Sequence, residues 1–136
     1  MPFPLRNGLG PLVLVFFIGL AAVLGSVYAN RYLDGKARAA AFVGGDPDRA
    51  PDLMLRHGCA GCHDIPGVRG PGGRVGPPLR QLGARVYIAG MLPNTPDNLV
   101  HWIVNPREIN PRTAMPRTGI TEPEARDVAA YLLSLQ

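Results

Sequence analysis

The pentapeptide Cys59-Ala60-Gly61-Cys62-His63 contains both cysteines of this 136-residue chain. In this C-x-x-C-H spacing, two thiols can add across the two vinyl groups of one haem while the adjacent histidine reaches the iron from the same side. The motif therefore predicts one haem c held covalently through Cys59 and Cys62, with His63 as an iron ligand.

Two other chemistries use paired cysteines, and the surrounding sequence disfavours both. A thioredoxin-like dithiol lies within a β-α-β unit, and a zinc site requires a second pair of ligands. His57 and His101 stand at unrelated spacing and supply such a pair poorly. His57 also lies too close to the attachment site to reach the opposite face of a haem.

A methionine is the expected ligand on the other side of the iron. Met115 lies in the segment 105–116, where three prolines prevent a helix interior and favour a stiff, extended loop. A stiff loop that presents one thioether suits a weak iron–sulfur bond. Met91 and His101 are the competing candidates, but Met91 is interpreted as an apolar packing residue and His101 as a polar residue on the preceding helix.

The N-terminal segment is apolar over a length that can cross a membrane. No charged side chain occurs between residues 7 and 30. Residues 9–29 make a helix of about 31 Å, which matches a bilayer core of about 30 Å, and they are predicted as a transmembrane anchor. The alternative is a cleaved signal peptide, with Arg6 as its basic region and a cleavage site after Ala29.

The distribution of basic residues disagrees weakly with an outward-facing C-terminal part. Arg31, Lys36 and Arg38 follow the apolar segment, whereas only Arg6 and the terminal amine precede it. The positive-inside count therefore favours a cytoplasmic C-terminal side. The C-x-x-C-H motif outweighs this count, because haem is attached to the chain on the outer face. Both interpretations of the N-terminus export residues 30–136.

Composition restricts the remaining function classes. The chain has 14 basic and 10 acidic residues, but the basic residues are scattered, so nucleic-acid binding is not expected. The 15 prolines and 17 glycines, with only 7% aromatic residues, leave little material for a large self-sufficient core. A cofactor is expected to complete the core, and no small-molecule substrate is expected.

Helical patterns surround the motif, so the predicted fold class is all-α. Residues 52–57 and 95–105 are predicted as helices, and the capping box Thr121-Glu-Pro-Glu124 opens the last one. Residues 58–90, with nine glycines and four prolines, are predicted to wrap as loops, and residues 42–51 to form a linker. The predicted inward positions of the last two helices are Leu99, Trp102, Ile103, Val128, Tyr131, Leu132 and Leu135.

With these elements in place, residues 52–135 resemble the small one-haem cytochromes c with histidine and methionine ligands. The resemblance implies three to four short helices and loops around one covalent haem, preceded here by the transmembrane helix. Gly76-Pro77-Pro78-Leu79 resembles the family's Gly-Pro-x-Leu. This implies that the Pro77 carbonyl accepts a hydrogen bond from His63 and fixes its ring orientation.

The resemblance also implies roles for three residues near the haem. The segment 105–115 matches the residues that precede the ligand methionine in the family. This implies that Thr113 hydrogen-bonds a haem propionate. Trp102 stands where many members carry an aromatic residue over the haem, and Arg85 is the implied propionate partner. The alternative interpretations are packing for Trp102 and a solvated charge for Arg85.

One position departs from the family pattern. Many members have a glycine eight residues before the first cysteine, which allows the first helix to cross close to an aromatic residue of the last helix. Here that position is Pro51, whereas the aromatic residue, Tyr131, is present.

A narrower resemblance concerns residues 85–99, 102–106 and 115–116. They are similar to the cytochrome c domain fused to subunit II of some bacterial haem–copper oxidases. The chain lacks that subunit's copper-site cysteine pair and cupredoxin strands, so it resembles a free-standing, anchored form of the haem domain. This implies that its electrons go to a terminal oxidase.

The expected organisation has four parts: a cytoplasmic N-terminus at 1–8, the anchor at 9–29, a periplasmic extension and linker at 30–50, and a cytochrome c domain at 51–136.

The expected function is one-electron transfer at the periplasmic face of the bacterial inner membrane, with lipid and a terminal oxidase or another respiratory complex as partners. The alternatives are an integral subunit of a larger oxidoreductase and a haem sensor or peroxidase. A basic rim that steers docking is expected from Arg56, Arg69, Arg74, Arg112 and Arg117.

Overall fold

The computed structural model describes residues 9–136 of the chain. The expected cytoplasmic N-terminus at 1–8, including Arg6, lies outside the described residues. The chain divides into two compact units, one ending at Asp34 and one running from Gly35 to Gln136. Each unit is described separately below.

The first unit consists of most of α1, a 35-residue helix from Leu9 to Val43 that continues into the second unit. Every side chain from residue 10 to residue 34 is exposed. Among the described residues, one helix is long and apolar enough to cross a membrane, spanning Gly10–Val43 near the N-terminus. Its length and composition fit an anchor and a signal sequence equally well.

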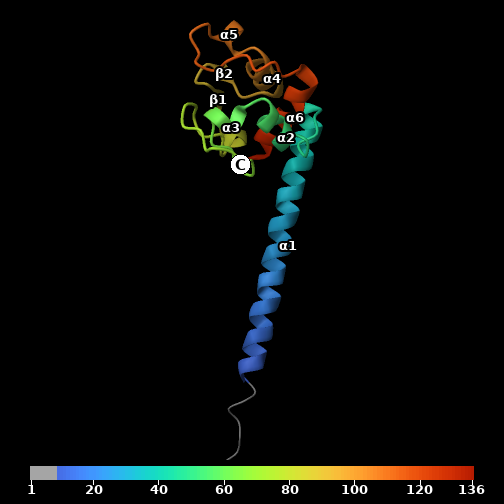
Figure 1. Cartoon of the computed structure of the whole chain (residues 1–136). Helices are drawn as coiled ribbons and strands as arrows, with labels where there is room; N and C mark the ends of the chain where they lie inside the picture. The colour runs from blue at the N-terminus through green and yellow to red at the C-terminus, as the bar shows by residue number, and fades with distance from the viewer. Residues whose placement is uncertain (1–8) are drawn as a thin grey trace, which may run out of the picture. The chain divides into compact units, whose positions relative to one another are not determined.

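The second unit is mostly helical (Figure 1), which confirms the predicted class. A two-stranded antiparallel pair, with Tyr87 opposite Pro93 and Ile88 opposite Leu92, was not predicted. The strands are two residues each, too short to produce an alternating pattern. After α1 the elements are α2 (Ala50–Arg56), α3 (Cys59–Cys62), the 3-10 turn η1 (Leu82–Ala84), β1 (Tyr87–Ile88), β2 (Leu92–Pro93), α4 (Pro96–Val104), α5 (Pro106–Ile109) and α6 (Glu122–Ser134).

Local capping explains where the two longest helices of this unit begin. The hydroxyl of Thr95 accepts a hydrogen bond from the backbone N–H of Asn98, and Pro96 occupies the first turn of α4. At the start of α6, the carboxylate of Glu124 accepts from the backbone N–H of Thr121 at 3.0 Å and from its hydroxyl at 2.8 Å. The predicted starts of both helices are confirmed.

The core forms where α6 packs against α2 and α4. The predicted inward positions of α4 and α6 are confirmed as buried, except that Leu135 is half-buried. From α2, Leu53 and Met54 complete the core and are at most 2% exposed. These contacts fix α6 against the helix that leads into the C-x-x-C-H motif.

The turn between α1 and α2 is packed directly against α6. A Cβ atom on Gly45 would lie 2.3 Å from the backbone oxygen of Arg126, so only glycine fits this approach. Asp127, which is 5% exposed, accepts a hydrogen bond from the backbone N–H of Asp46 at 2.7 Å and pairs with Arg49 at 3.1 Å. The close approach to α6 is therefore made by Gly45.

Proline at position 51, where many family members have glycine, does not prevent α2 from packing against α6. Pro51 lies in the first turn of α2, where proline is tolerated, and its neighbour Ala50 is fully buried. On α6, Ala125 and Ala129 are also fully buried. The two helices are in contact, and each has small buried side chains.

Candidate haem site

The two cysteines occupy a single helical turn. Gly58, with a φ of 72°, ends the preceding helix and allows the chain to turn into α3. Cys59 and Cys62 are three residues apart on this turn, so their side chains share one face. Both are half-buried. Before haem is attached, burial raises the pKa of the Cys59 thiol, with a smaller contribution from Cys62.

His63 leaves α3 with an extended backbone, and its ring is held by one hydrogen bond. Ring Nδ1 lies 2.8 Å from the carbonyl oxygen of Pro77, the contact that the family resemblance implies. Because a carbonyl can only accept, Nδ1 carries the proton and donates. The lone pair is then on Nε2, the nitrogen that can bind a metal.

The loop after the motif is packed against the imidazole through glycine. A Cβ atom on Gly76 would lie 2.3 Å from His63 Cε1 and 2.6 Å from Nδ1. The backbone N–H of Gly76 donates to the carbonyl oxygen of Cys62 at 2.8 Å. A Cβ atom on Gly73 would lie 2.4 Å from the backbone oxygen of Gly61. The loop thus forms a glycine cradle, residues 73–76, that fixes the histidine ring against the attachment turn.

The loop that carries Met115 is built from hydrogen-bonded turns. The carbonyl oxygen of Asn110 accepts from the backbone N–H of Thr113 at 3.0 Å, and the Thr113 hydroxyl accepts from the backbone N–H of Met115 at 3.2 Å. Met115 is half-buried against the core, whereas Met91 is 49% exposed in the turn between the two strands. Thr113 therefore holds the backbone of Met115, and its hydroxyl hydrogen stays free to donate elsewhere.

The beginning of this loop is fastened by Glu108. Its carboxylate accepts from the side-chain amide of Asn105 at 2.6 Å and lies 3.3 Å from Nε2 of His101. The hydrogen bond from His101 contributes most to a lowered pKa of Glu108, followed by Asn105, with a weaker contribution from the charge of Arg117. His101 thus contacts Glu108 on the surface.

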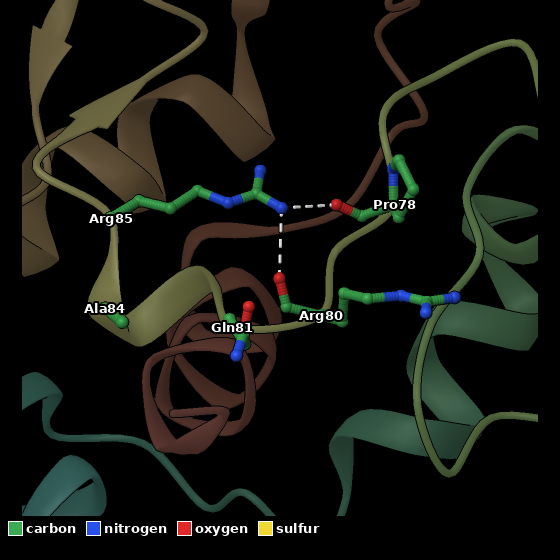
Figure 2. A pocket seen from close by; sticks show the side chains of 5 residues that line it. All are labelled: Pro78, Arg80, Gln81, Ala84 and Arg85. Carbon is green, nitrogen blue, oxygen red and sulfur yellow. Dashed lines mark hydrogen bonds between the residues drawn. The ribbon is translucent and has the colours of Figure 1, made fainter.

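Arg85 spans a pocket of about 310 Å³ beside the loop after Pro77. In Figure 2 its guanidinium points to the carbonyl oxygens of Pro78 and Arg80, and Nη2 donates to both. The Arg80 side chain points away from Arg85 in this view, and it pairs with Asp64. Nη1 and Nε of Arg85 make no hydrogen bond with the described residues, so they are available to a carboxylate. The pocket is lined by Pro78, Arg80, Gln81, Ala84 and Arg85.

The aromatic residues of the two longest helices of this unit have different surroundings. Trp102 is 9% exposed and belongs to the hydrophobic core. The hydroxyl of Tyr131 donates to the carbonyl oxygen of Pro66 at 2.6 Å, and a Cβ atom on Gly67 would lie 2.4 Å from that hydroxyl. Tyr131 therefore fastens the segment after His63 to α6, a contact that no sequence spacing indicates.

The arrangement fits a covalent haem better than the two competing chemistries. Within residues 9–136, no group of three or more His, Cys, Asp or Glu side chains converges to hold a metal ion. The two short strands follow the cysteine turn and are adjacent in sequence, so no β-α-β unit surrounds the dithiol. Two thiols on one face and an adjacent imidazole with its Nε2 lone pair available match the covalent attachment and the histidine ligand that haem c uses.

Comparisons with known proteins identify the family to which this part of the chain belongs. A family model described as cytochrome c matches residues 48–136. Cytochrome c oxidase subunit 2 of Alkalihalophilus pseudofirmus is 36% identical to the chain over 85 residues. That alignment covers 62% of this chain and 24% of the relative, so the chain spans about a quarter of the relative's length. The chain therefore belongs to the cytochrome c family, with an electron-transfer domain that binds haem c covalently through Cys59 and Cys62.

Proposed function

We propose that this protein is a one-electron carrier anchored in the bacterial inner membrane, with its haem domain on the periplasmic side. His63 and Met115 are the two axial ligands in this proposal. The residues that hold or cover the haem around them are Pro77, Arg85, Trp102 and Thr113.

The observation that carries the proposal is that an imidazole and a thioether are presented by two separately fixed segments. His63 is held between Pro77 and the glycine cradle, and Met115 is held at its backbone by Thr113. The haem supplies an iron that gains and loses one electron, and a thioether ligand raises its potential. Two protein ligands leave no open position for a substrate, which favours a carrier over a sensor or peroxidase.

The exposure of α1 supports an anchored carrier. Its side chains from residue 10 to residue 34 are all exposed, and the stretch without charges is long enough for a bilayer core of about 30 Å. An apolar surface of this extent requires lipid or a partner to cover it. An anchor keeps the carrier at the membrane where respiratory complexes reside.

The proposed electron acceptor is a terminal haem–copper oxidase. Its support is the relative described as cytochrome c oxidase subunit 2, which is similar to this chain over 85 residues. A docking surface for an acidic patch is available from arginines that are all exposed, namely Arg56, Arg69, Arg74, Arg112 and Arg117. Such charges steer association more than they add affinity.

A second candidate function is a stoichiometric subunit of a larger oxidoreductase. The observation that favours it is that the relative is itself described as a subunit. In this case α1 packs against other membrane helices instead of lying alone in lipid. Copurification in mild detergent separates the two candidates, because a mobile carrier leaves its partner and a subunit does not.

The test uses the full chain purified from detergent-solubilised membranes. We expect an intact mass that includes residues 1–29 and one haem, and rapid oxidation of the reduced protein by a haem–copper oxidase in shared proteoliposomes. Raising ionic strength from low to physiological values should slow this oxidation about threefold or more, because exposed charges are screened. A mass that begins at Asn30 contradicts the anchor, and a rate independent of salt contradicts the basic rim.

A further inference from the structure

His57 is a largely buried histidine with no part in the proposed iron ligation. It follows the last residue of α2, two positions before Cys59, and its side chain is 13% exposed. The side chain turns toward two acceptors. Ring Nδ1 lies 3.4 Å from the carbonyl oxygen of Thr118, and Nε2 lies 3.5 Å from a carboxylate oxygen of Glu124.

The contact with Thr118 joins the two ligand-bearing segments of the chain. Thr118 stands three residues after Met115, whereas His57 stands directly before the turn at Gly58 that opens the attachment motif. A carbonyl oxygen can only accept, so Nδ1 must donate to it. The hydrogen bond therefore runs from the end of α2 to the far end of the methionine loop, 61 residues along the chain.

The segment after Thr118 is anchored by the core and by Glu124, the carboxylate that also lies 3.5 Å from His57 Nε2. Ile120 is 4% exposed in the core, and Thr121 is bonded through its N–H and its hydroxyl to Glu124. The start of the methionine loop is fastened by Glu108, as described above. Thr118 lies between these two fastened points, and its contact with His57 joins the methionine loop to the end of α2.

We propose that His57 is a positioning residue for the axial methionine, because it fastens the end of the Met115 loop to the helix from which the attachment motif starts. This inference rests on the proposed ligation of the iron by Met115. With both ends held, the loop has few conformations in which Met115 moves away from the iron. Without His57 the far end is held from Ile120 onward, so the unfastened stretch is longer and the methionine is displaced more easily.

The experiment measures how readily added imidazole displaces the methionine from the ferric iron of the full-length, haem-loaded protein in detergent. His57→Leu removes both ring nitrogens at similar volume. His57→Asn keeps an amide that can donate to the Thr118 carbonyl. Arg56→Gln is the matched control, because Arg56 is the adjacent residue, is 66% exposed and faces the same Glu124 carboxylate at 3.7 Å.

We expect His57→Leu to bind imidazole about 3- to 10-fold more tightly than the wild type, which is the effect of one lost hydrogen bond. His57→Asn and Arg56→Gln should stay within about twofold of the wild type. Hydrogen exchange at residues 117–120 should accelerate in His57→Leu alone, which a purely electrostatic role would not produce.

Three results would overturn the proposal. Wild-type imidazole affinity in a folded His57→Leu protein removes the positioning role, and an equal effect of Arg56→Gln assigns the change to charge. If His57→Leu does not fold, tight imidazole binding by His57→Asn contradicts the role of the donated hydrogen bond. A wild-type ferric protein without the weak red absorption of a thioether-bound haem overturns the ligation by Met115 as well, so the two failures are distinguishable.

Discussion

The two segments that present the proposed axial ligands are held by different physical means. On the histidine side, Gly73 packs against the backbone of the attachment turn and Gly76 against the His63 ring, and a Cβ atom at either position would make contacts shorter than 3 Å. On the methionine side, the loop is held by single hydrogen bonds from Thr113, Glu108 and His57. The short contacts on the histidine side leave no room for a Cβ atom at these glycines, whereas each hydrogen bond on the methionine side can be removed separately. From this difference we expect Met115 to be the more easily displaced of the two proposed ligands.

The largest effect is expected from breaking the histidine side with Gly76→Ala. The added methyl group would overlap the His63 ring at 2.3 Å, and the glycine backbone also bonds to Cys62. Overpacking of this kind costs about 3 kcal/mol. We expect most of the covalent haem to be lost, measured as haem per protein by the pyridine haemochrome spectrum. Gly61→Ala is the control, because a Cβ atom there meets nothing within 4 Å; equal haem loss in both variants would contradict the cradle.

A smaller effect is expected on the methionine side from Thr113→Val. This variant keeps the shape but removes the oxygen that accepts the Met115 backbone N–H at 3.2 Å. Loss of one such bond costs about 1 kcal/mol, which corresponds to imidazole binding about fivefold more tightly to the ferric iron. Thr113→Ser keeps the hydroxyl and should bind imidazole like the wild type. If both variants bind imidazole equally tightly, the hydroxyl is not what holds the loop.

The smallest effect is expected from Glu108→Gln, because this carboxylate is on the surface and screened by solvent. Hydrogen bonds from His101 and Asn105 hold the pKa of Glu108 below its ordinary value of 4.5. Its contribution to stability is therefore complete above pH 4.5 and is lost as pH falls through the lowered pKa.

This pH dependence is measured as the melting temperature between pH 6 and pH 3. The decrease should be slightly smaller in Glu108→Gln than in the wild type. Arg107→Gln, at the adjacent exposed residue, should follow the wild type. A steeper decrease in Glu108→Gln than in the wild type would contradict the assigned role.

Features that depend on residues close together in the chain could be predicted from the sequence. The attachment motif, the Thr95 and Thr121 caps and the inward positions of α6 depend on residues within a few positions of one another, so their spacing is visible in the chain. The two-residue strands are too short for a period to appear. Local rules therefore predict the elements and the attachment site.

Contacts between distant residues could not be predicted in the same way. Gly45 against the backbone of Arg126, Tyr131 on Pro66 and His57 on Thr118 join positions 61 to 81 residues apart. Nothing in their spacing distinguishes such a glycine or histidine from others in the chain. Resemblance to a family predicted the contact between His63 and Pro77, because the family motif already encodes it.

The most direct test of the two-sided account is the identity of the second iron ligand. The weak red absorption band of ferric haem bound to a thioether should be present in the wild type, absent in Met115→Leu and unchanged in Met91→Leu. Its loss in Met115→Leu should be accompanied by a fall in midpoint potential on the order of 0.1 V or more, since axial ligands set haem potentials over about 0.8 V. A band that survives in Met115→Leu, or a high-spin wild-type iron, would contradict the account.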